Sequence, residues 1–393
     1  MRLGFHYHIP ARIVNGKIYT MSVQGLFLDS LAIHCEKVIL FLYKPLESEL
    51  PSLDYEIQSG NVELVSLVKH YSIPVRLLLN RLVRAKINKR VKDIDILLMR
   101  APTPLLPLIT KDIKKKIKFS YLVVGEMADH IDHIPQANWR RGFLRSYILW
   151  NENTQQQYAR EGFVFANSAV VYNKYKEFSQ QSALIRTTTL KQTDFFVRED
   201  TCTNGLPYQF LFTGRIERGK GILEIVEAIG MLNSGGIDCQ LNIVGWATPG
   251  DETPDLINEI TTKWGIEDKV IFHGSKKIGE ELFSFYRKAD IYIIASQVAE
   301  GFPRTIAEAM ASSLPVISTA VGSIGHFHSH KHDIMLIEPR NPSDIVEKVK
   351  ELINNPSLRQ MIIKNGLQSV QEVTLEVQGK KVIDTLKEYL VKN

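Results

Sequence analysis

The sequence predicts an α/β protein built from doubly wound, mostly parallel sheets. In the second half of the chain, short apolar segments of strand character alternate with segments whose apolar residues recur at helical spacing, as in successive βα units. The first half is less regular but contains similar apolar segments. Strands are expected at residues 37–43, 95–100, 120–125, 208–214, 239–245, 269–274, 289–296 and 314–319, and helices at 221–232, 254–265, 280–289, 305–312 and 343–355.

The length of the chain, 393 residues, suits two domains of ordinary size. The polar stretch at residues 197–207 contains Asn, Gly and Pro and is the best candidate for a linker. We therefore expect one domain at residues 1–195 and a second at residues 196–375. Residues 376–393 are expected to form a C-terminal helix.

Composition narrows the class of protein. Apolar residues make up 44% of the chain, as in ordinary globular proteins, and no apolar run approaches the roughly 18 residues that span a bilayer. The first residues lack the long apolar region of a signal peptide. Cys35, Cys202 and Cys239 form no CxxC pair, so neither a disulfide framework nor a zinc site is indicated. The expected location is the cytoplasm.

Charge is unevenly distributed along the chain. Residues 1–195 carry a net charge of +10 and residues 196–393 a net charge of −5, so the first half is expected to meet an anionic partner. Residues 76–92 hold seven basic residues and no acidic one. Four apolar residues of this segment fall near one face at helical spacing: Leu78, Leu82, Val83 and Ile87.

Such a segment predicts either a basic amphipathic helix on an anionic membrane surface or an ordinary solvated helix face. The first alternative would place the protein peripherally on the inner face of the cytoplasmic membrane. Nucleic acid is not expected as a partner, because no nucleic-acid-binding module or aromatic stacking motif accompanies the charge.

Two carboxylates, Glu300 and Glu308, stand eight positions apart around the start of a predicted helix. Pro303 suits the first turn of that helix, and an apolar strand candidate precedes it. Free backbone N–H groups near Gly301 and Phe302 could hold an anion or a sugar hydroxyl, and ionised carboxylates accept hydrogen bonds from vicinal hydroxyls. The alternative is that one glutamate is merely a solvated helix residue.

The segment GRIERGKG, residues 214–221, directly follows a predicted strand and opens a helix. It satisfies GxxxxGK, but Gly221 stands where a P-loop needs Ser or Thr for magnesium, which argues against an NTPase. Arg215 and Lys220 could instead neutralise a diphosphate without a metal, the first as a planar fork and the second as a point charge. Surface cations in an ordinary βα turn are the simpler alternative.

Together these segments resemble retaining glycosyltransferases of family 4, which have the GT-B architecture. Ser296, EGFPRTIAEAMA and LPVIS follow the order of that family's EX7E signature, and GRIERGKG resembles the loop that contacts the donor diphosphate. The chain departs from the pattern at Ser313, where Gly is usual. It departs again in GSIGHF, residues 322–327, where the family typically has GG..E, so a donor contact from that loop is in question.

The resemblance implies two Rossmann-like domains facing each other across a cleft. The first domain would bind the acceptor, the second the nucleotide sugar, and the C-terminal helix would pack back on the first domain. The implied reaction is retaining, metal-independent transfer of a sugar from a UDP- or GDP-sugar, without a cofactor. The acceptor would be a saccharide or lipid-linked saccharide, as in bacterial surface polysaccharide or lipopolysaccharide synthesis. A nucleotide-sugar epimerase of the same fold and a non-catalytic sugar-nucleotide binder stay open as alternatives.

The resemblance assigns roles in the site to the residues of this chain that stand at matching positions. Catalytic roles fall to Glu300, His130 and Lys220, and the base is expected near the turns at strand ends in the second domain. The expected diphosphate ligands are Arg215, Lys220 and Gly16; the expected sugar and ribose ligands are Glu300, Gly301, Phe302, Arg304, Thr305 and Glu308; and the base region holds Gly245, His273 and Gly274.

Overall fold

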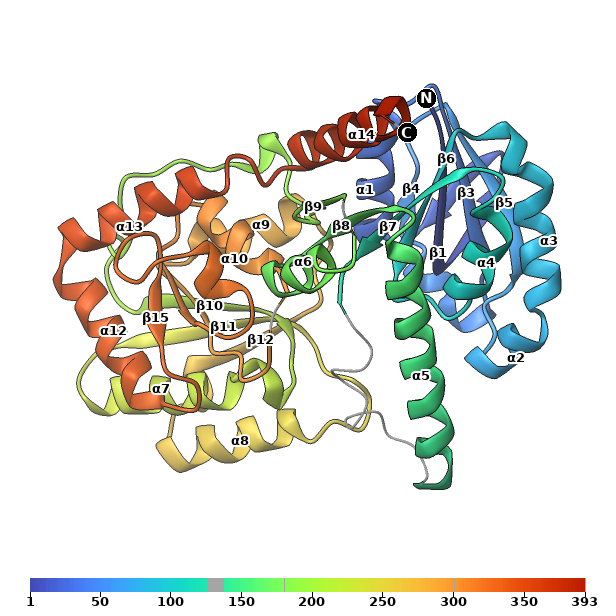
Figure 1. Cartoon of the computed structure of the whole chain (residues 1–393). Coiled ribbons are helices and arrows are strands. Elements are labelled where there is room, and N and C mark those ends of the chain that lie inside the picture. Colours follow the sequence, from blue (N-terminus) through green and yellow to red (C-terminus); the bar gives the residue numbers. More distant parts are fainter. Residues whose placement is uncertain (126–137, 180, 300, 393) are drawn as a thin grey trace. The chain divides into compact units, whose positions relative to one another are not determined.

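The computed structural model describes residues 1–125, 138–179, 181–299 and 301–392 (Figure 1). The described chain divides into two compact units. Unit 1 comprises Met1–Thr189 together with Leu375–Asn393, and unit 2 comprises Leu190–Thr374. Among the described residues, no helix is both long and apolar enough to cross a bilayer.

Unit 2 contains a six-stranded parallel sheet whose strands run in the order β12-β11-β10-β13-β14-β15. Chain order reverses between β10 and β13, as in a doubly wound Rossmann-like sheet. The short apolar segments form these strands because both faces of the sheet are covered. The strands are β10 (Tyr208–Arg215), β11 (Cys239–Trp246), β12 (Val270–Gly274), β13 (Ile291–Ile294), β14 (Val316–Thr319) and β15 (Met335–Ile337).

The helices of unit 2 connect these strands and bury one apolar stripe each. On α7, Ile222, Ile225 and Ile229 recur at helical spacing and are fully buried in the core of the unit. Each such side chain contributes about 1.5–3 kcal/mol of transfer free energy. The helices are α7 (Ile222–Ser234), α8 (Thr253–Trp264), α9 (Glu280–Lys288), α10 (Arg304–Ala311), α11 (Ile324–Phe327), α12 (Pro342–Asn354) and α13 (Pro356–Ser369).

Unit 1 has a nine-stranded sheet whose parallel part runs β5-β3-β1-β6-β7-β8-β9, so its chain order reverses between β1 and β6. Beyond this part, β1 continues into an antiparallel ribbon with β2 and β4. The strands are β1 (Arg2–Val14), β2 (Lys17–Thr20), β3 (Lys37–Lys44), β4 (Tyr55–Glu56), β5 (Val62–Lys69), β6 (Ile96–Ala101), β7 (Lys118–Val123), β8 (Phe163–Ala166) and β9 (Ser182–Leu184).

Helices of unit 1 pack on this sheet, and α14 from the end of the chain lies beside α1 (Figure 1). The prediction of an α/β protein with two Rossmann-like domains is therefore confirmed. The helices are α1 (Ser22–Ala32), α2 (Ile73–Leu78), α3 (Asn80–Arg90), α4 (Leu106–Ile113), α5 (Asn138–Ala159), α6 (Ala169–Lys176) and α14 (Leu375–Lys392).

Two local predictions need correction. Residues 197–207 are no free linker, because Asp200 forms a bidentate ion pair with Arg359 and Asp290 accepts a hydrogen bond from the Cys202 amide, all within unit 2. The four apolar residues of segment 76–92 also do not lie on one face, contrary to the prediction. Val83 and Ile87 are buried in the core of unit 1, whereas Leu78 and Leu82 are exposed. The reason is that positions 82 and 83 differ by about 100° around a helix axis.

Candidate functional site

The candidate site lies where the chain order of unit 2 reverses. In parallel sheets of this kind, the loops that follow the two strands at the reversal part to opposite faces and leave a ligand-binding crevice at their carboxyl ends. The two loops here are residues 214–221, after β10, and residues 295–303, after β13. These are the two segments that the sequence analysis singled out. Fold topology therefore brings the GRIERGKG loop beside the segment that leads into α10.

Direct contacts hold the two loops together. The Gln297 amide donates to the Gly219 carbonyl at 2.8 Å, and the Gln297 side chain donates to Glu224 Oε1 of α7 at 2.7 Å. Gly221 has a φ of +68°, and a Cβ atom on it would lie 1.9 Å from the Ala295 carbonyl oxygen. Since only glycine fits both the backbone and the space, Gly221 lets the loop close onto the end of β13.

Two of the predicted diphosphate ligands lie on this loop. Arg215 ends β10 with its side chain 55% exposed, and its Nη1 atom lies 3.2 Å from Glu217 Oε2. Lys220 ends a short 3₁₀ turn (Arg218–Lys220) directly before α7. Both cations are thus on the loop at the crevice, close to the N-terminus of α7, where backbone N–H groups favour anions. An incoming diphosphate would compete with Glu217 for Arg215.

Glu308 is buried, with 5% of its surface exposed, on the inner side of α10. Its Oε2 atom accepts a hydrogen bond from the Tyr286 hydroxyl at 2.8 Å. Tyr286 in turn lies 2.6 Å from Thr213 Oγ1, and the Thr213 hydroxyl is 3.2 Å from that of Tyr292. Burial and the Glu308 carboxylate raise the pKa of Tyr286, so its hydroxyl stays protonated and available as a donor. This network fixes one oxygen of the carboxylate.

The other predicted sugar ligands lie at the start of α10. Phe302 packs edge-on against Phe327 with ring centroids 6.0 Å apart, and it is almost fully buried. Arg304 is the first residue of the helix, and Thr305 shares a hydrogen bond with Tyr292. Gly301 is partly exposed in the bend before them. Two further predicted residues, Glu300 and His130, lie outside the described residues.

The predicted base region lies at the ends of β11 and β12, next to the GRIERGKG loop. Gly245 has a φ of +156°, and a Cβ atom there would lie 1.7 Å from the Gly214 carbonyl oxygen, so these strands meet closely. His273 Nε2 lies 2.8 Å from Asn242 Oδ1 and therefore donates to it, because an amide oxygen only accepts. Gly274 follows as the last residue of β12.

Gly16 lies elsewhere, in the two-residue turn of the hairpin between β1 and β2 of unit 1. Asn15 and Gly16 have φ values of 51° and 78°, which is the backbone of a tight hairpin turn with an Asn-Gly sequence. The neighbouring Lys17 pairs with Glu56 at 2.8 Å. The turn alone explains this glycine, and a phosphate contact from Gly16 stays a prediction.

The atypical GSIGHF segment leads into α11, where Phe327 packs on Phe302. His328 follows and forms a buried pair with Asp333, with 2.7 Å between Nδ1 and Oδ2. Burial opposes ionisation of Asp333, but hydrogen bonds from His328 and the Ser329 amide outweigh it and lower the pKa of Asp333. The segment therefore supports the start of α10 by packing.

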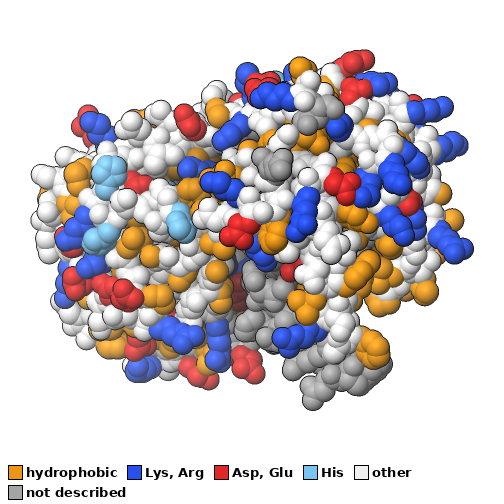
Figure 2. All heavy atoms as spheres, in the orientation of Figure 1, with side chains coloured by type: hydrophobic (Ala, Val, Ile, Leu, Met, Phe, Trp, Pro, Cys, Tyr) orange, Lys and Arg blue, Asp and Glu red, His pale blue; other side chains and the backbone are white. Residues whose placement is uncertain are grey.

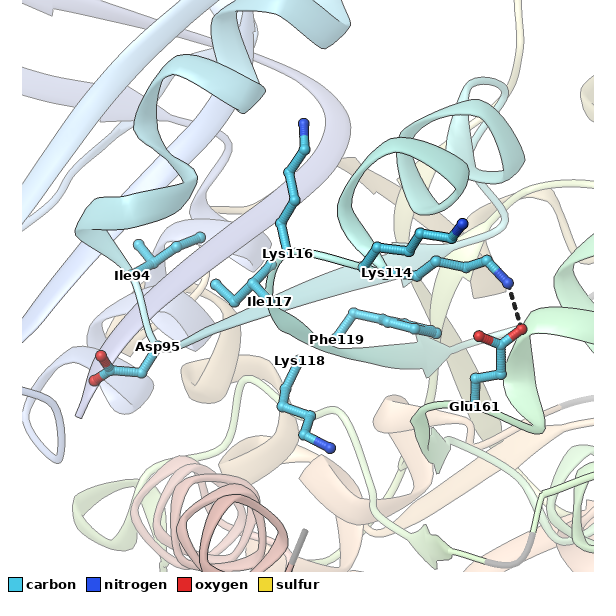
Figure 3. A pocket seen from close by; sticks show the side chains of 9 residues that line it. Ile94, Asp95, Lys114, Lys116, Ile117, Lys118, Phe119 and Glu161 are labelled. Atoms are coloured by element: carbon cyan, nitrogen blue, oxygen red, sulfur yellow. Dashed lines mark hydrogen bonds and ion pairs between the residues drawn. The ribbon is translucent and has the colours of Figure 1, made fainter.

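A hollow of about 500 Å³ in unit 1 lies at the amino ends of β6 and β7, away from the edge where parallel sheets bind ligands (Figure 3). Four lysines surround it, but three of them contact other groups: Lys114 pairs with Glu161, Lys116 donates to Asn88, and Lys118 lies over the Tyr389 ring. The hollow is a solvated basic surface and adds nothing to the candidate site.

Sequence reasoning missed the residues that support the predicted ones. Tyr286, Thr213 and Gln297 position Glu308 and the two loops, yet they come from segments that the sequence marks only as strand, helix and loop. Their partners are 22 to 79 positions away, so no local pattern could identify them.

Comparison with known proteins finds relatives that match part of the chain. An uncharacterized glycosyltransferase of Methanocaldococcus jannaschii is 30% identical over 194 residues, 48% of this chain and 52% of that protein. A D-inositol 3-phosphate glycosyltransferase of Paenarthrobacter aurescens is 30% identical over 155 residues, 39% of this chain and 37% of that protein. The chain thus spans about half the length of the first relative and less of the second.

Solved structures match along the whole chain at low identity, which shows the fold. Anabaena HepE in complex with UDP and glucose has a TM-score of 0.71 at 14% identity, covering 99% of this chain and 100% of that chain. Sucrose-phosphate synthase from Thermosynechococcus elongatus has a TM-score of 0.72 at 16% identity, covering all of both chains. The fold is that of GT-B glycosyltransferases. A family model described as "Glycosyl transferases group 1" matches residues 196–369, which lie within unit 2.

Proposed function

We propose that the protein is a retaining, metal-independent glycosyltransferase that moves a sugar from a UDP- or GDP-sugar to a saccharide or lipid-linked saccharide, in the synthesis of a bacterial surface polysaccharide or lipopolysaccharide. One observation carries the proposal: the GRIERGKG loop and the segment before α10 are hydrogen-bonded side by side at the chain reversal of unit 2. The names of relatives support it, since they include a glycosyltransferase of capsular polysaccharide biosynthesis from Staphylococcus aureus. Structural neighbours with bound UDP and UDP-glucose support the donor class.

In the proposed reaction, the bond between the anomeric carbon and the diphosphate oxygen breaks, and its electron pair stays on the diphosphate. Arg215, Lys220 and the N-terminus of α7 stabilise the charge that develops there. The acceptor hydroxyl attacks the same face of the sugar, and its proton passes to the leaving diphosphate. Glu300 holds sugar hydroxyls, Glu308 holds the ribose, and His130 is a further residue to which we assign a catalytic role.

Tyr286 supports the proposed role of Glu308. A carboxylate that already accepts one hydrogen bond from a buried hydroxyl is fixed in orientation, so it does not lose rotamer entropy when ribose binds.

A donor panel separates this proposal from its alternatives. The protein is incubated with UDP-, GDP- and ADP-sugars with and without saccharide acceptors, and nucleotide release and sugar products are followed separately. A transferase releases nucleotide and forms a new glycoside only with an acceptor. An epimerase changes the donor without an acceptor, and a non-catalytic binder yields no product. Transfer that persists unchanged in both Glu300→Gln and Lys220→Ala variants would contradict the assigned site.

We also propose that unit 1 contacts an anionic membrane surface through α2 and α3. Leu78 and Leu82 are 82% and 56% exposed, and Arg81 and Lys89 are exposed beside them. On the face drawn in Figure 2, Lys and Arg side chains lie among apolar ones over unit 1. Apolar insertion flanked by cations is how an amphipathic helix binds lipid headgroups. Arg84 takes no part, because it is paired with Asp112.

Flotation with anionic vesicles tests this contact. A variant with Leu78→Ser, Leu82→Ser, Arg81→Gln and Lys89→Gln is expected to lose binding, since both the apolar and the charged contributions are removed. The matched control removes the same charge from another exposed surface of unit 1 with Lys111→Gln and Lys115→Gln. Absence of binding by the parent protein, or equal loss in the control, would overturn the proposal.

A further inference from the structure

The chain reversal of unit 1, between β1 and β6, gathers a second set of polar side chains. They come from the middle of β1, where its pairing with β6 ends, from the ends of β3 and β5, from the residues after β6, and from α2. This is the edge at which a doubly wound sheet binds ligands, but here the loops are short and side chains take the place of glycines. The set comprises His6, His8, Tyr43, His70, Arg76 and Thr103.

Arg76 is the central member of this cluster. Only 5% of its surface is exposed, and its Nε and Nη1 atoms have no hydrogen-bond partner among the described residues. Its contacts are with Tyr43, whose ring centroid lies 5.3 Å from the guanidinium carbon and whose hydroxyl shares a hydrogen bond with it. A buried guanidinium without a carboxylate partner is costly, because desolvation removes the water that satisfied its donors.

Two histidines, His6 and His8, lie within electrostatic reach of this guanidinium, and their tautomers follow from their partners. His6 Nδ1 lies 2.8 Å from the Phe41 carbonyl and donates to it, so Nε2 is left as an acceptor without a partner. His8 Nδ1 lies 3.0 Å from Thr103 Oγ1, whose own hydrogen goes to the Arg100 carbonyl, so His8 also donates through Nδ1 and keeps Nε2 as an acceptor. His8 is partly exposed and marks the open side of the cluster.

Positive charge dominates the electrostatics of this cluster. Burial is the main cause that lowers the pKa of His6 to about 4 and that of His8 to about 3, and Arg76 lowers both further. Glu49 acts on Arg76 electrostatically, but it already accepts from His70 at 2.5 Å and from the Leu46 amide at 2.8 Å. His6 and His8 are therefore neutral, and no carboxylate of the described residues forms an ion pair with Arg76.

We propose that this cluster is an oxyanion site, in which Arg76 binds a phosphate or carboxylate group of the acceptor and His8 Nε2 accepts a hydrogen bond from an acceptor hydroxyl. A guanidinium donates charge-assisted hydrogen bonds to the oxygens of either anion. The anion would pair with the charge of Arg76 and satisfy an orphan donor. That the anion belongs to a sugar acceptor rests on the proposed function; the anion site itself does not.

Binding of small oxyanions to the full-length protein tests the site. Inorganic phosphate and acetate are titrated separately while the imidazole NMR signals of His8 and His6 are followed, and the two titrations distinguish a phosphate site from a carboxylate site. Saturable shifts are expected with at least one of them. Arg76→Met should weaken binding by about tenfold or more, because it removes charge-assisted hydrogen bonds. Arg81→Met, an exposed neighbour on α3, is the matched control and should bind as the parent does.

Thermal unfolding separates a ligand-binding role of Arg76 from a structural one. Without ligand, Arg76→Met is expected to melt no lower than the parent, because it removes an uncompensated buried charge. Should this variant fold poorly, Arg76→Lys keeps the charge but lacks the planar fork, and it is expected to lose affinity as well. Equal anion binding by the parent and the Arg76 variants, or no saturable shift with either anion, would overturn the site.

Binding of UDP and GDP is measured on the same proteins and reports on unit 2. Anion binding without nucleotide binding would contradict the proposed function and leave the oxyanion site standing. Nucleotide binding without anion binding would overturn the oxyanion site and leave the proposed function standing.

Discussion

The parallel parts of the sheets in units 1 and 2 have the same doubly wound strand order, but different groups form the edge of each sheet at its chain reversal. In unit 2 the edge consists of backbone: Gly221 and Gly245 let loops meet within distances that no Cβ would permit, and the flanking cations are on the surface. In unit 1 it consists of buried side chains centred on Arg76 and His6. A backbone-built edge offers amide groups and flanking cations to a ligand, whereas a side-chain-built edge offers a guanidinium and imidazoles. The comparison teaches that one strand order can present different chemistry at the same edge.

The largest effect is expected from Lys220→Ala in unit 2. Removal of a preorganised cation from the leaving diphosphate should lower kcat/KM for transfer by about 10²–10³-fold. Arg218→Ala is the matched control, since Arg218 lies on the same 3₁₀ turn with its side chain 62% exposed, and it should stay within about twofold. Equal losses of kcat/KM in both variants would mean that the loop acts through its total positive charge and not through Lys220 in particular.

Unit 1 should respond to pH through His6. In the folded protein the pKa of His6 is about 4, against an ordinary value of 6.5, because burial disfavours the charged form. The unfolded chain therefore binds more protons between these values, and the free energy of unfolding should fall by about 3 kcal/mol as pH decreases from 6.5 towards 4. Urea unfolding of the parent and His6→Asn between pH 7 and pH 4 measures this, with exposed His332→Asn as control. A parent with the same pH slope as His6→Asn would refute it.

Gly221→Ala tests the backbone-built edge of unit 2. The new Cβ would lie 1.9 Å from a carbonyl oxygen, on a left-handed backbone. The free energy of unfolding of unit 2 should therefore fall by more than about 2 kcal/mol. Gly250→Ala shares the positive φ but meets open space, so it isolates the cost of the backbone alone, about 1 kcal/mol. Chemical unfolding compares the two variants. Similar losses in the free energy of unfolding would show that the close approach of residue 221 to the carbonyl oxygen is unimportant.

The smallest effect is expected from Tyr286→Phe, which removes the hydrogen bond to Glu308. Loss of this buried donor should cost about 1–3 kcal/mol of stability and raise the donor KM, because the carboxylate loses its fixed orientation. Urea unfolding and donor kinetics measure both quantities. Lost stability with an unchanged donor KM would mean that Glu308 does not depend on Tyr286.

Much of the fold and part of the candidate site could be predicted from the sequence. Strands expected at residues 208–214 and 239–245 are β10 and β11, and the helix expected at residues 305–312 is α10, because both strand and helix patterns are local. The first strand, β1, was not predicted, since its middle reads HYHIP and carries polar residues into the core. His6 is fully buried there only because β3 and β6 flank it.

The sequence by itself determined the fold class, the order of βα units in the second half, and the two loops that carry glycines, cations and carboxylates. These follow from local periodicity and from residue types that only certain turns accept. Only the tertiary structure decided that Tyr286 holds Glu308, that Gln297 joins the two loops, and that Arg76 is buried with no ion-pair partner in the described part of the chain. Burial and hydrogen-bond partners arise between segments far apart in the chain, and no local pattern records them.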